Sequence, residues 1–148
     1  MENIKTITTN SPQETIELGK KLGSLLKGGE IIALIGALGS GKTHLIKGIA
    51  AGAGAEDQNL VNSPTFVIVN EYTGRLDIYH IDAYRIETIN EFEMLGFSDF
   101  CYPDSVVLIE WADRVEDALK DTDCIEINIQ HTAQTTRTIQ IKNIPAEL

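Results

Sequence analysis

Basic residues and long apolar runs are scarce in this sequence. Its 148 residues include 12 lysines and arginines against 22 aspartates and glutamates, which gives a formal net charge of −10. Nonspecific binding of nucleic acids and adhesion to anionic membranes both require a basic surface, so both are disfavoured. Because no apolar run approaches the length of a membrane span, we expect no membrane contact.

Thiols are also few. Cys101 and Cys124 are the two cysteines, and their spacing matches neither a metal-ligand pattern nor a disulfide framework. We expect both side chains to be buried as small apolar groups. Since no charged segment followed by an apolar one opens the sequence, we expect a reduced, cytoplasmic compartment.

Length and composition are those of one globular domain. The chain is 43% hydrophobic and 23% charged, which is ordinary for a globular protein, and 148 residues are enough to bury a core. No internal repeat, low-complexity tract or linker interrupts it. We therefore predict a single domain over residues 1–148.

One stretch carries a specific chemical pattern, Gly36-Ala37-Leu38-Gly39-Ser40-Gly41-Lys42-Thr43. It fits G-x-x-x-x-G-K-[ST], the phosphate-binding P-loop, at every fixed position. The apolar run 31–35 before it is typical of a buried parallel strand, and residues 43–52 after it have helical spacing. A Gly-rich turn with a chance lysine is the plain alternative, and the matching strand and helix disfavour it.

The residue types in this loop explain how it would hold a nucleotide. Glycines let the backbone approach a ligand closely, and the N–H groups of the loop and of the helix start form an anion site. Lys42 is expected to reach the β- and γ-phosphates, and the Thr43 hydroxyl to bind Mg²⁺. The predicted cofactors are ATP and Mg²⁺. The predicted nucleotide-binding residues are Gly39, Ser40, Gly41, Lys42, Thr43 and His44.

The remaining pattern mixes strands with helices. Residues 4–9 resemble an edge strand, and Ser11-Pro12-Gln13-Glu14 is a capping box that opens a helix ending near Lys27. Residues 67–72 and 76–82 predict a hairpin, and 106–109 a second buried strand. Short helices are expected at 91–95 and 112–119, and two strands at 124–129 and 137–142. This order predicts an α/β three-layer, P-loop NTPase-like fold with a mixed, partly parallel central sheet.

A P-loop needs a carboxylate at the end of a neighbouring strand to hold Mg²⁺. Glu110 follows four consecutive apolar residues, and Asp82 closes the second arm of the hairpin. We predict that Glu110 holds the metal and that Asp82 shares the metal or orients the attacking water. The alternative is a pair of solvated or helix-capping carboxylates. The predicted catalytic residues are Lys42, Asp82 and Glu110, with Thr43 and Glu110 at the metal.

Other residues have two interpretations each. Ser63 and Thr65 flank a proline, either in a segment that senses the γ-phosphate or in a turn that opens a strand. Trp111, the single tryptophan, stacks on a base, faces a partner or belongs to the core. His80 lies in an alternating strand, where a structural role is favoured. Arg85 is expected to pair with a carboxylate rather than to reach phosphate.

Four blocks in this order and spacing closely resemble the bacterial TsaE (YjeE) family of small P-loop ATPases. They are the P-loop, Ser63-Pro64-Thr65-Phe66, His80-Ile81-Asp82-Ala83-Tyr84-Arg85 and Glu110-Trp111. The likeness runs from the N-terminal helix to about residue 120, and includes the segment 93–97. The four blocks together are far more specific than a P-loop alone.

The resemblance implies a role in making N6-threonylcarbamoyladenosine at position 37 of tRNAs that read ANN codons. Family members bind a TsaB–TsaD pair, and their ATP hydrolysis supports repeated rounds of modification, so tRNA would be met only through that complex. The family's ATP, Mg²⁺ and turnover residues match Lys42, Thr43, Asp82 and Glu110. The segment at Ser63 and Thr65 would be switch-like. Further candidates for switching or partner contact are Tyr84, Arg85 and Trp111.

Two positions depart from the family's pattern. Many members have an acidic residue where this chain has Ala37, and a second threonine where it has His44. The backbone cradle survives both changes, but His44 offers no hydroxyl, so nucleotide affinity or the α-phosphate contact is expected to differ. For the adenine we expect walls from the loop near Asn10 and from the C-terminal strands.

Two other function classes use the same loop. A small-molecule kinase needs a basic lid over the phosphates, and between Arg75 and Arg114 only Arg85 and His80 could supply one. A nucleotide-gated binding module would bind ATP without turning it over until a partner is added. A GTPase is disfavoured because no Asn-Lys-x-Asp sequence occurs.

Overall fold

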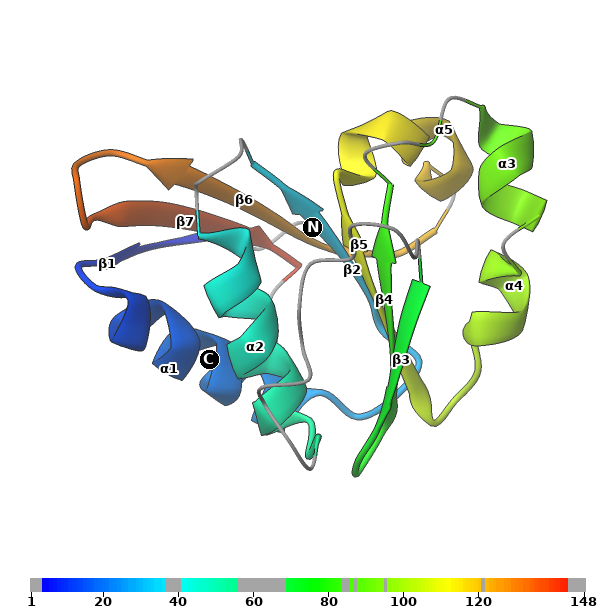
Figure 1. The fold of residues 1–148 in the computed structure, drawn as a ribbon, viewed down its shortest axis with the longest axis horizontal. Coiled ribbons are helices and arrows are strands. Elements are labelled where there is room, and N and C mark those ends of the chain that lie inside the picture. The colour runs from blue at the N-terminus through cyan, green and yellow to red at the C-terminus, as the bar shows by residue number, and fades with distance from the viewer. Residues whose placement is uncertain are drawn as a thin grey trace.

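The computed structural model describes residues 4–36, 41–55, 69–83, 86, 88–94, 96–120 and 122–143, and Figure 1 shows their arrangement around one twisted sheet. In chain order the elements are β1 (Ile4–Thr9), α1 (Pro12–Leu25), β2 (Ile31–Ile35), α2 (Lys42–Gly52), β3 (Val69–Thr73), β4 (Asp77–Asp82), α3 (Ile89–Met94), α4 (Phe97–Phe100), β5 (Ser105–Glu110), the 3₁₀ helix η2 (Ala112–Val115), α5 (Glu116–Leu119), β6 (Ile125–His131) and β7 (Arg137–Lys142).

The seven strands lie in the order β1-β7-β6-β2-β5-β4-β3. At the centre, β2 pairs in parallel with both β5 and β6, and β4 pairs in parallel with β5. The outer pairs, β3 with β4, β6 with β7 and β1 with β7, are antiparallel. The mixed sheet, the two parallel core strands, the hairpin and the N-terminal edge strand predicted from the sequence are confirmed.

Helices cover the sheet from two sides, which confirms the three-layer prediction. Figure 1 shows α1 and α2 together on one side, and α3, α4 and α5 on the other, beside β4 and β5. Side chains alternate along the strands, so each strand feeds both layers. On β5, Val106 and Leu108 join the core under α1 and α2, whereas Val107 and Ile109 join the core under the other helices.

The first helix begins as its sequence predicts. The Ser11 hydroxyl accepts a hydrogen bond of 3.1 Å from the N–H of Glu14, and the Glu14 carboxylate accepts one of 3.1 Å from the N–H of Asn10. The first bond is that of a capping box, and the second reaches the residue before the N-cap instead of the N-cap itself. The helix ends at Leu25, two residues earlier than expected at Lys27, because Leu26 is already extended (φ −70°, ψ 137°).

Helices α1 and α2 touch through their backbones. A Cβ on Gly19 would lie 2.5 Å from the carbonyl oxygen of Leu45, and a Cβ on Gly48 would lie 2.1 Å from that of Ile16. Neither position accepts a side chain without a shift of the helices. The contact therefore holds the two helices at a close, backbone-to-backbone distance.

Three local expectations were wrong. Residues 112–119 do not form one helix: a 3₁₀ turn and a short α-helix meet at Val115, whose backbone (φ −121°, ψ 26°) is not helical. Helix α3 begins at Ile89, earlier than expected at Glu91. The two cysteines are not buried: Cys101 is exposed and Cys124 is half-buried. Cys101 follows the four-residue helix α4, and its thiol donates to the carbonyl oxygen of Phe97.

Among the helices of the described residues, none has both the length and the apolar content that crossing a membrane requires.

Candidate functional site

The ends of three parallel strands converge on the start of α2. Strand β2 leads into Gly36, β4 ends at Asp82 and β5 ends at Glu110. Glu110 is the register partner of both Asp82 and Leu34. Asp82 is four residues after Ile78, and Glu110 is two residues after Leu108. Both Ile78 and Leu108 belong to the core under α2, so both carboxylates lie on the α2 side of the sheet. Carboxyl ends of parallel strands are where open α/β sheets bind ligands.

Helix α2 opens on a left-handed glycine. Gly41 has φ 101° and ψ 13° and caps the helix, a conformation in which a side chain would be strained. The first intrahelical bond described there runs from Leu45 N to Gly41 O. The N–H groups of Lys42, Thr43 and His44 come before it and lie at the positive end of the helix dipole. This end of α2 has the features of an anion site.

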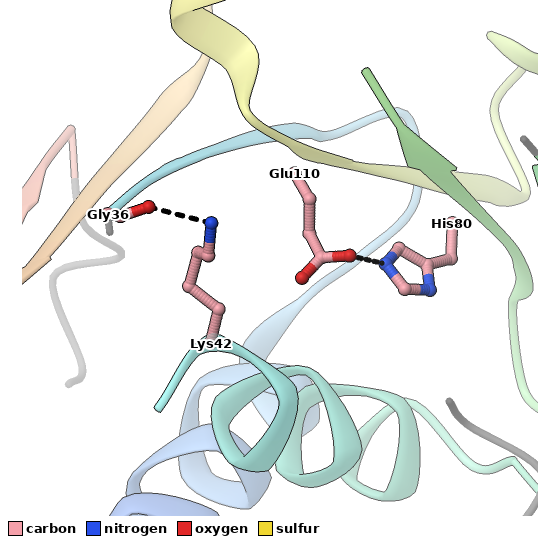
Figure 2. Close-up of polar contacts among 4 residues, drawn as sticks. All are labelled: Gly36, Lys42, His80 and Glu110. Atoms are coloured by element: carbon pink, nitrogen blue, oxygen red, sulfur yellow. Dashed lines mark hydrogen bonds and ion pairs between the residues drawn. The ribbon is translucent and has the colours of Figure 1, made fainter. Parts of the chain in front are cut away.

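Lys42 is buried at the head of this helix, with 6% of its surface exposed. Its ammonium nitrogen donates a hydrogen bond of 2.7 Å to the carbonyl oxygen of Gly36, as Figure 2 shows. The same nitrogen lies 3.6 Å from the centre of the Trp111 ring. The lysine is therefore held between the end of β2 and the residue that follows β5.

Burial lowers the pKa of Lys42 below its ordinary value, because desolvation disfavours the charged form. The negative charges of Glu110, Asp82 and Asp113, in decreasing order of effect, raise the pKa of Lys42. Desolvation is the larger effect. The ammonium thus lies within the field of the two predicted site carboxylates, and one further charge of −1 or more near it would favour its charged form.

Glu110 is almost fully buried and is paired across the sheet with a histidine. Oε2 of Glu110 lies 2.9 Å from Nε2 of His80, and the two side chains are 4% and 0% exposed. Figure 2 shows Glu110 between His80 and Lys42, with its second oxygen on the lysine side. His80 was expected to be structural. Its position two residues before Asp82, on the same face of β4, is the sequence signal that places it beside the site.

Trp111 adopts an unusual backbone conformation. Its φ of 59° and ψ of 40° lie in the left-handed region, which non-glycine residues seldom occupy. The residue turns the chain from β5 into η2 and places its half-buried ring against Lys42. The structure therefore gives Trp111 a contact with the P-loop lysine.

A small hollow of about 60 Å³ adjoins the start of α2. It is lined by the first turn of α1, by Gly41 and His44, by the turn between β6 and β7, and by Arg137. A Cβ on Gly41 would lie 3.2 Å from Nε of Arg137. The C-terminal strands were expected near the adenine, but Arg137 itself was not predicted, because only the antiparallel pairing of β7 with β6 brings this distant residue to the loop.

A larger cavity, of about 840 Å³, lies at the other end of the central strands, where β2 and β6 begin. Its lining includes Gly29, Ile31, Cys124 and Asn143, at the beginnings of β2 and β6. None of its described lining residues belongs to the P-loop or to the first turn of a helix. The smaller hollow beside α2 adjoins the candidate site.

Several predicted site residues lie outside the described part of the chain: Gly39, Ser40, Ser63, Thr65, Tyr84 and Arg85. Ala37, one of the two departures from the family pattern, lies outside it as well. Of the remaining predictions, the structure brings Gly41, Lys42, Thr43 and His44 to the head of α2, and Asp82, Glu110 and Trp111 to the facing strand ends.

Comparison of the sequence with known proteins gives one consistent result. The family model described as "Threonylcarbamoyl adenosine biosynthesis protein TsaE" matches residues 9–139. The tRNA threonylcarbamoyladenosine biosynthesis protein TsaE of Treponema pallidum is 35% identical over 133 residues, which are 90% of this chain and 96% of the relative. The protein of the same name from Bacillus subtilis is 42% identical over 120 residues, covering 80% and 73% of the two chains.

The fold comparison agrees. A crystal structure of Bacillus subtilis YdiB is similar to this chain with a TM-score of 0.78 and 30% sequence identity. The likeness covers 99% of this chain and 90% of the other.

Proposed function

The chain belongs to the TsaE family, and on that basis we propose that it binds ATP with Mg²⁺ at the head of α2 and hydrolyses it in the biosynthesis of threonylcarbamoyladenosine in tRNA. One observation carries the ATPase part of this proposal. A buried lysine at the start of α2 faces two carboxylates at the ends of adjacent parallel strands, β4 and β5. This is the arrangement that phosphoryl transfer on a P-loop requires.

Lys42 and the first turn of α2 bind the phosphates in this proposal. The N–H groups of Lys42, Thr43 and His44 precede the first helical bond and point to where phosphate oxygens would lie. The Lys42 ammonium gives up the Gly36 carbonyl and turns to the β- and γ-phosphates. Phosphate charge beside a desolvated ammonium favours its charged form, so binding offsets the cost of burying it.

The residues present fit a magnesium ion that arrives with the nucleotide. Within the described ranges no group of three or more His, Cys, Asp or Glu side chains is placed to hold a metal by itself. Magnesium in phosphate sites is typically held by one or two carboxylates together with phosphate oxygens and water. Thr43 and Glu110 would hold it here. When bound, it would stabilise negative charge on the phosphates.

Asp82 completes the site. It is the register partner of Glu110 and lies on the same face of the sheet. We assign it to the metal or to the water that attacks the γ-phosphate; in either role its carboxylate acts next to that of Glu110. We propose that the nucleoside lies over the hollow between α1, His44 and Arg137. Since 60 Å³ is far below the roughly 300 Å³ of an enclosing ligand pocket, the base lies against its mouth.

The proposed partner is a TsaB–TsaD pair, with tRNA met only through that complex. The names of the relatives support a place in this modification, and the net charge of −10 disfavours direct tRNA binding. We expect weak hydrolysis by the chain alone, in the cytoplasm of a bacterial cell, and stronger hydrolysis in the complex.

The test is release of phosphate from ATP with Mg²⁺, measured for the chain alone and with a TsaB–TsaD pair, with Glu110→Ala as the control. The expected result is stimulation by the pair that is lost in the variant. ATP binding without stimulation would overturn the proposal and favour a kinase, to be followed by a screen of phosphate acceptors. Tight, salt-sensitive tRNA binding by the isolated chain would contradict the indirect role.

A further inference from the structure

His80 makes one hydrogen bond described in the structure, and that bond joins two strands at the candidate site. The residue lies on β4, directly opposite Leu108 of β5 in the parallel register, while its ring reaches forward to Glu110 at the end of β5. Nε2 lies 2.9 Å from Oε2 of Glu110. With its side chain 0% exposed, His80 cannot itself meet solvent or a ligand at the surface.

The other ring nitrogen shows which tautomer this bond requires. Nδ1 of His80 is buried and has no hydrogen-bond partner among the described residues. An ionised carboxylate only accepts hydrogen bonds, so Nε2 carries the hydrogen and donates it to Glu110. A second hydrogen on Nδ1 would be a buried donor with no acceptor among the described residues, which costs about 1–3 kcal/mol. The ring therefore acts as a single, one-directional donor to Glu110.

We propose that His80 is a positioning residue for Glu110, and that it sets how strongly the site holds Mg²⁺. A glutamate side chain has several rotatable bonds, and fixing them costs conformational entropy. By holding Oε2, His80 pays this cost before any ligand arrives and leaves the second oxygen of Glu110 on the side of Lys42, as Figure 2 shows. This inference rests on the proposed function, in which that second oxygen meets the metal.

Partners that orient a metal ligand have measurable effects. Removing such a partner typically weakens metal affinity or activity by about 10- to 100-fold. A histidine that only fills the core would behave differently, because its loss would lower stability and leave Mg²⁺ dependence unchanged. The two roles are separable by experiment, since His80 does not touch the place assigned to the nucleotide.

The experiment compares variants by calorimetric titration with a non-hydrolysable ATP analogue, once with saturating Mg²⁺ and once with EDTA. The affinity with Mg²⁺ divided by the affinity in EDTA measures how far binding depends on Mg²⁺, independently of turnover. For His80→Leu we expect this ratio to fall by about 10- to 100-fold, with the affinity in EDTA unchanged. His80→Gln, whose amide nitrogen can replace Nε2 as the donor, is expected to restore most of the ratio.

Two controls separate the possible failures. Ile78 is fully buried on the same strand and face, so Ile78→Ala reports lost packing alone: its unfolding midpoint should fall while the ratio stays at the wild-type value.

Glu110→Gln removes the metal-binding charge. If it lowers the ratio and His80→Leu does not, the positioning role is overturned and the proposed function stands. If neither lowers it, both fail. Should His80→Leu not fold, His80→Asn, with a shorter amide, makes the same comparison.

Discussion

The ammonium nitrogen of Lys42 lies 3.6 Å from the centre of the Trp111 ring and 2.7 Å from the carbonyl oxygen of Gly36. Both contacts occupy the ammonium group that would bind the phosphates of a nucleotide. A cation over a tryptophan face contributes about 0.5–2 kcal/mol, more when it is desolvated. Nucleotide binding must therefore exchange these contacts for phosphate oxygens.

This exchange should be visible in the fluorescence of Trp111. Because the chain has one tryptophan, its tryptophan emission reports the surroundings of Trp111, and Lys42 is part of them. Saturating ATP analogue is expected to shift or change the emission as the ammonium leaves the ring, and Lys42→Ala should differ from wild type before any nucleotide is added. Emission that is the same in wild type and Lys42→Ala, with and without nucleotide, would mean that the contact does not exist in solution.

Removing the lysine charge should weaken phosphate binding. Hydrogen bonds to charged groups contribute about 1.5–3 kcal/mol each, so we expect Lys42→Ala to bind ATP roughly 10- to 150-fold more weakly in a calorimetric titration. Lys47, on the same helix and half-exposed, supplies the matched control: Lys47→Ala should bind as wild type does. Equal losses in the two variants would attribute the effect to general charge rather than to Lys42.

The contact between α1 and α2 predicts an unusual response to alanine. Alanine favours a helix over glycine by about 1 kcal/mol, yet a Cβ on Gly48 would lie 2.1 Å from a backbone oxygen that cannot move independently. We expect Gly48→Ala to lower the free energy of unfolding by about 2–4 kcal/mol in urea titrations. Ala51→Gly, on the same helix, should lower it by only about 1 kcal/mol. A stabilised Gly48→Ala protein would refute the close packing.

The thiol of Cys124 supplies a pH test at the far edge of the sheet. Burial, with the charges of Asp123 and Glu126, raises the pKa of Cys124 to about 11. Since the thiolate is the reactive form, only about 0.1% is reactive at pH 8, and alkylation should accelerate about tenfold per pH unit up to pH 11. The rate is measured with iodoacetamide in Cys101→Ser, so that one thiol reports. A rate that levels off near pH 9 would show an ordinary, solvated cysteine.

The sequence predicted the parts of the fold that local pattern controls. The apolar runs of β2 and β5 and the capping box of α1 each carry their signal within a few residues, and the structure has them where expected. Of the P-loop, the structure describes Gly36 after β2 and residues 41–43 at the start of α2. The same holds for Asp82 and Glu110, because a carboxylate directly after a strand lies at its carboxyl end whatever the sheet order. Their chemical roles stay predictions.

What the sequence did not reveal depends on contacts between distant segments. The backbone approach of Gly19 and Gly48 requires two helices to meet, and Arg137 reaches the loop only through the pairing of β7 with β6. The left-handed backbone at Trp111 could not be predicted, because the residue is not a glycine. His80 was expected to be structural, and the structure buries it. Its partner on the next strand follows from register, which alternation alone does not fix.

The most direct test of the nucleotide site is a crystal structure with Mg²⁺ and a non-hydrolysable ATP analogue. The proposed site requires the β- and γ-phosphates to lie against the first turn of α2. Lys42 should have left the Gly36 carbonyl to bind them, and the metal should lie between Thr43 and Glu110. A nucleotide bound anywhere else, such as in the cavity beside Cys124, or a Lys42 still bonded to Gly36 with phosphate present, would contradict it.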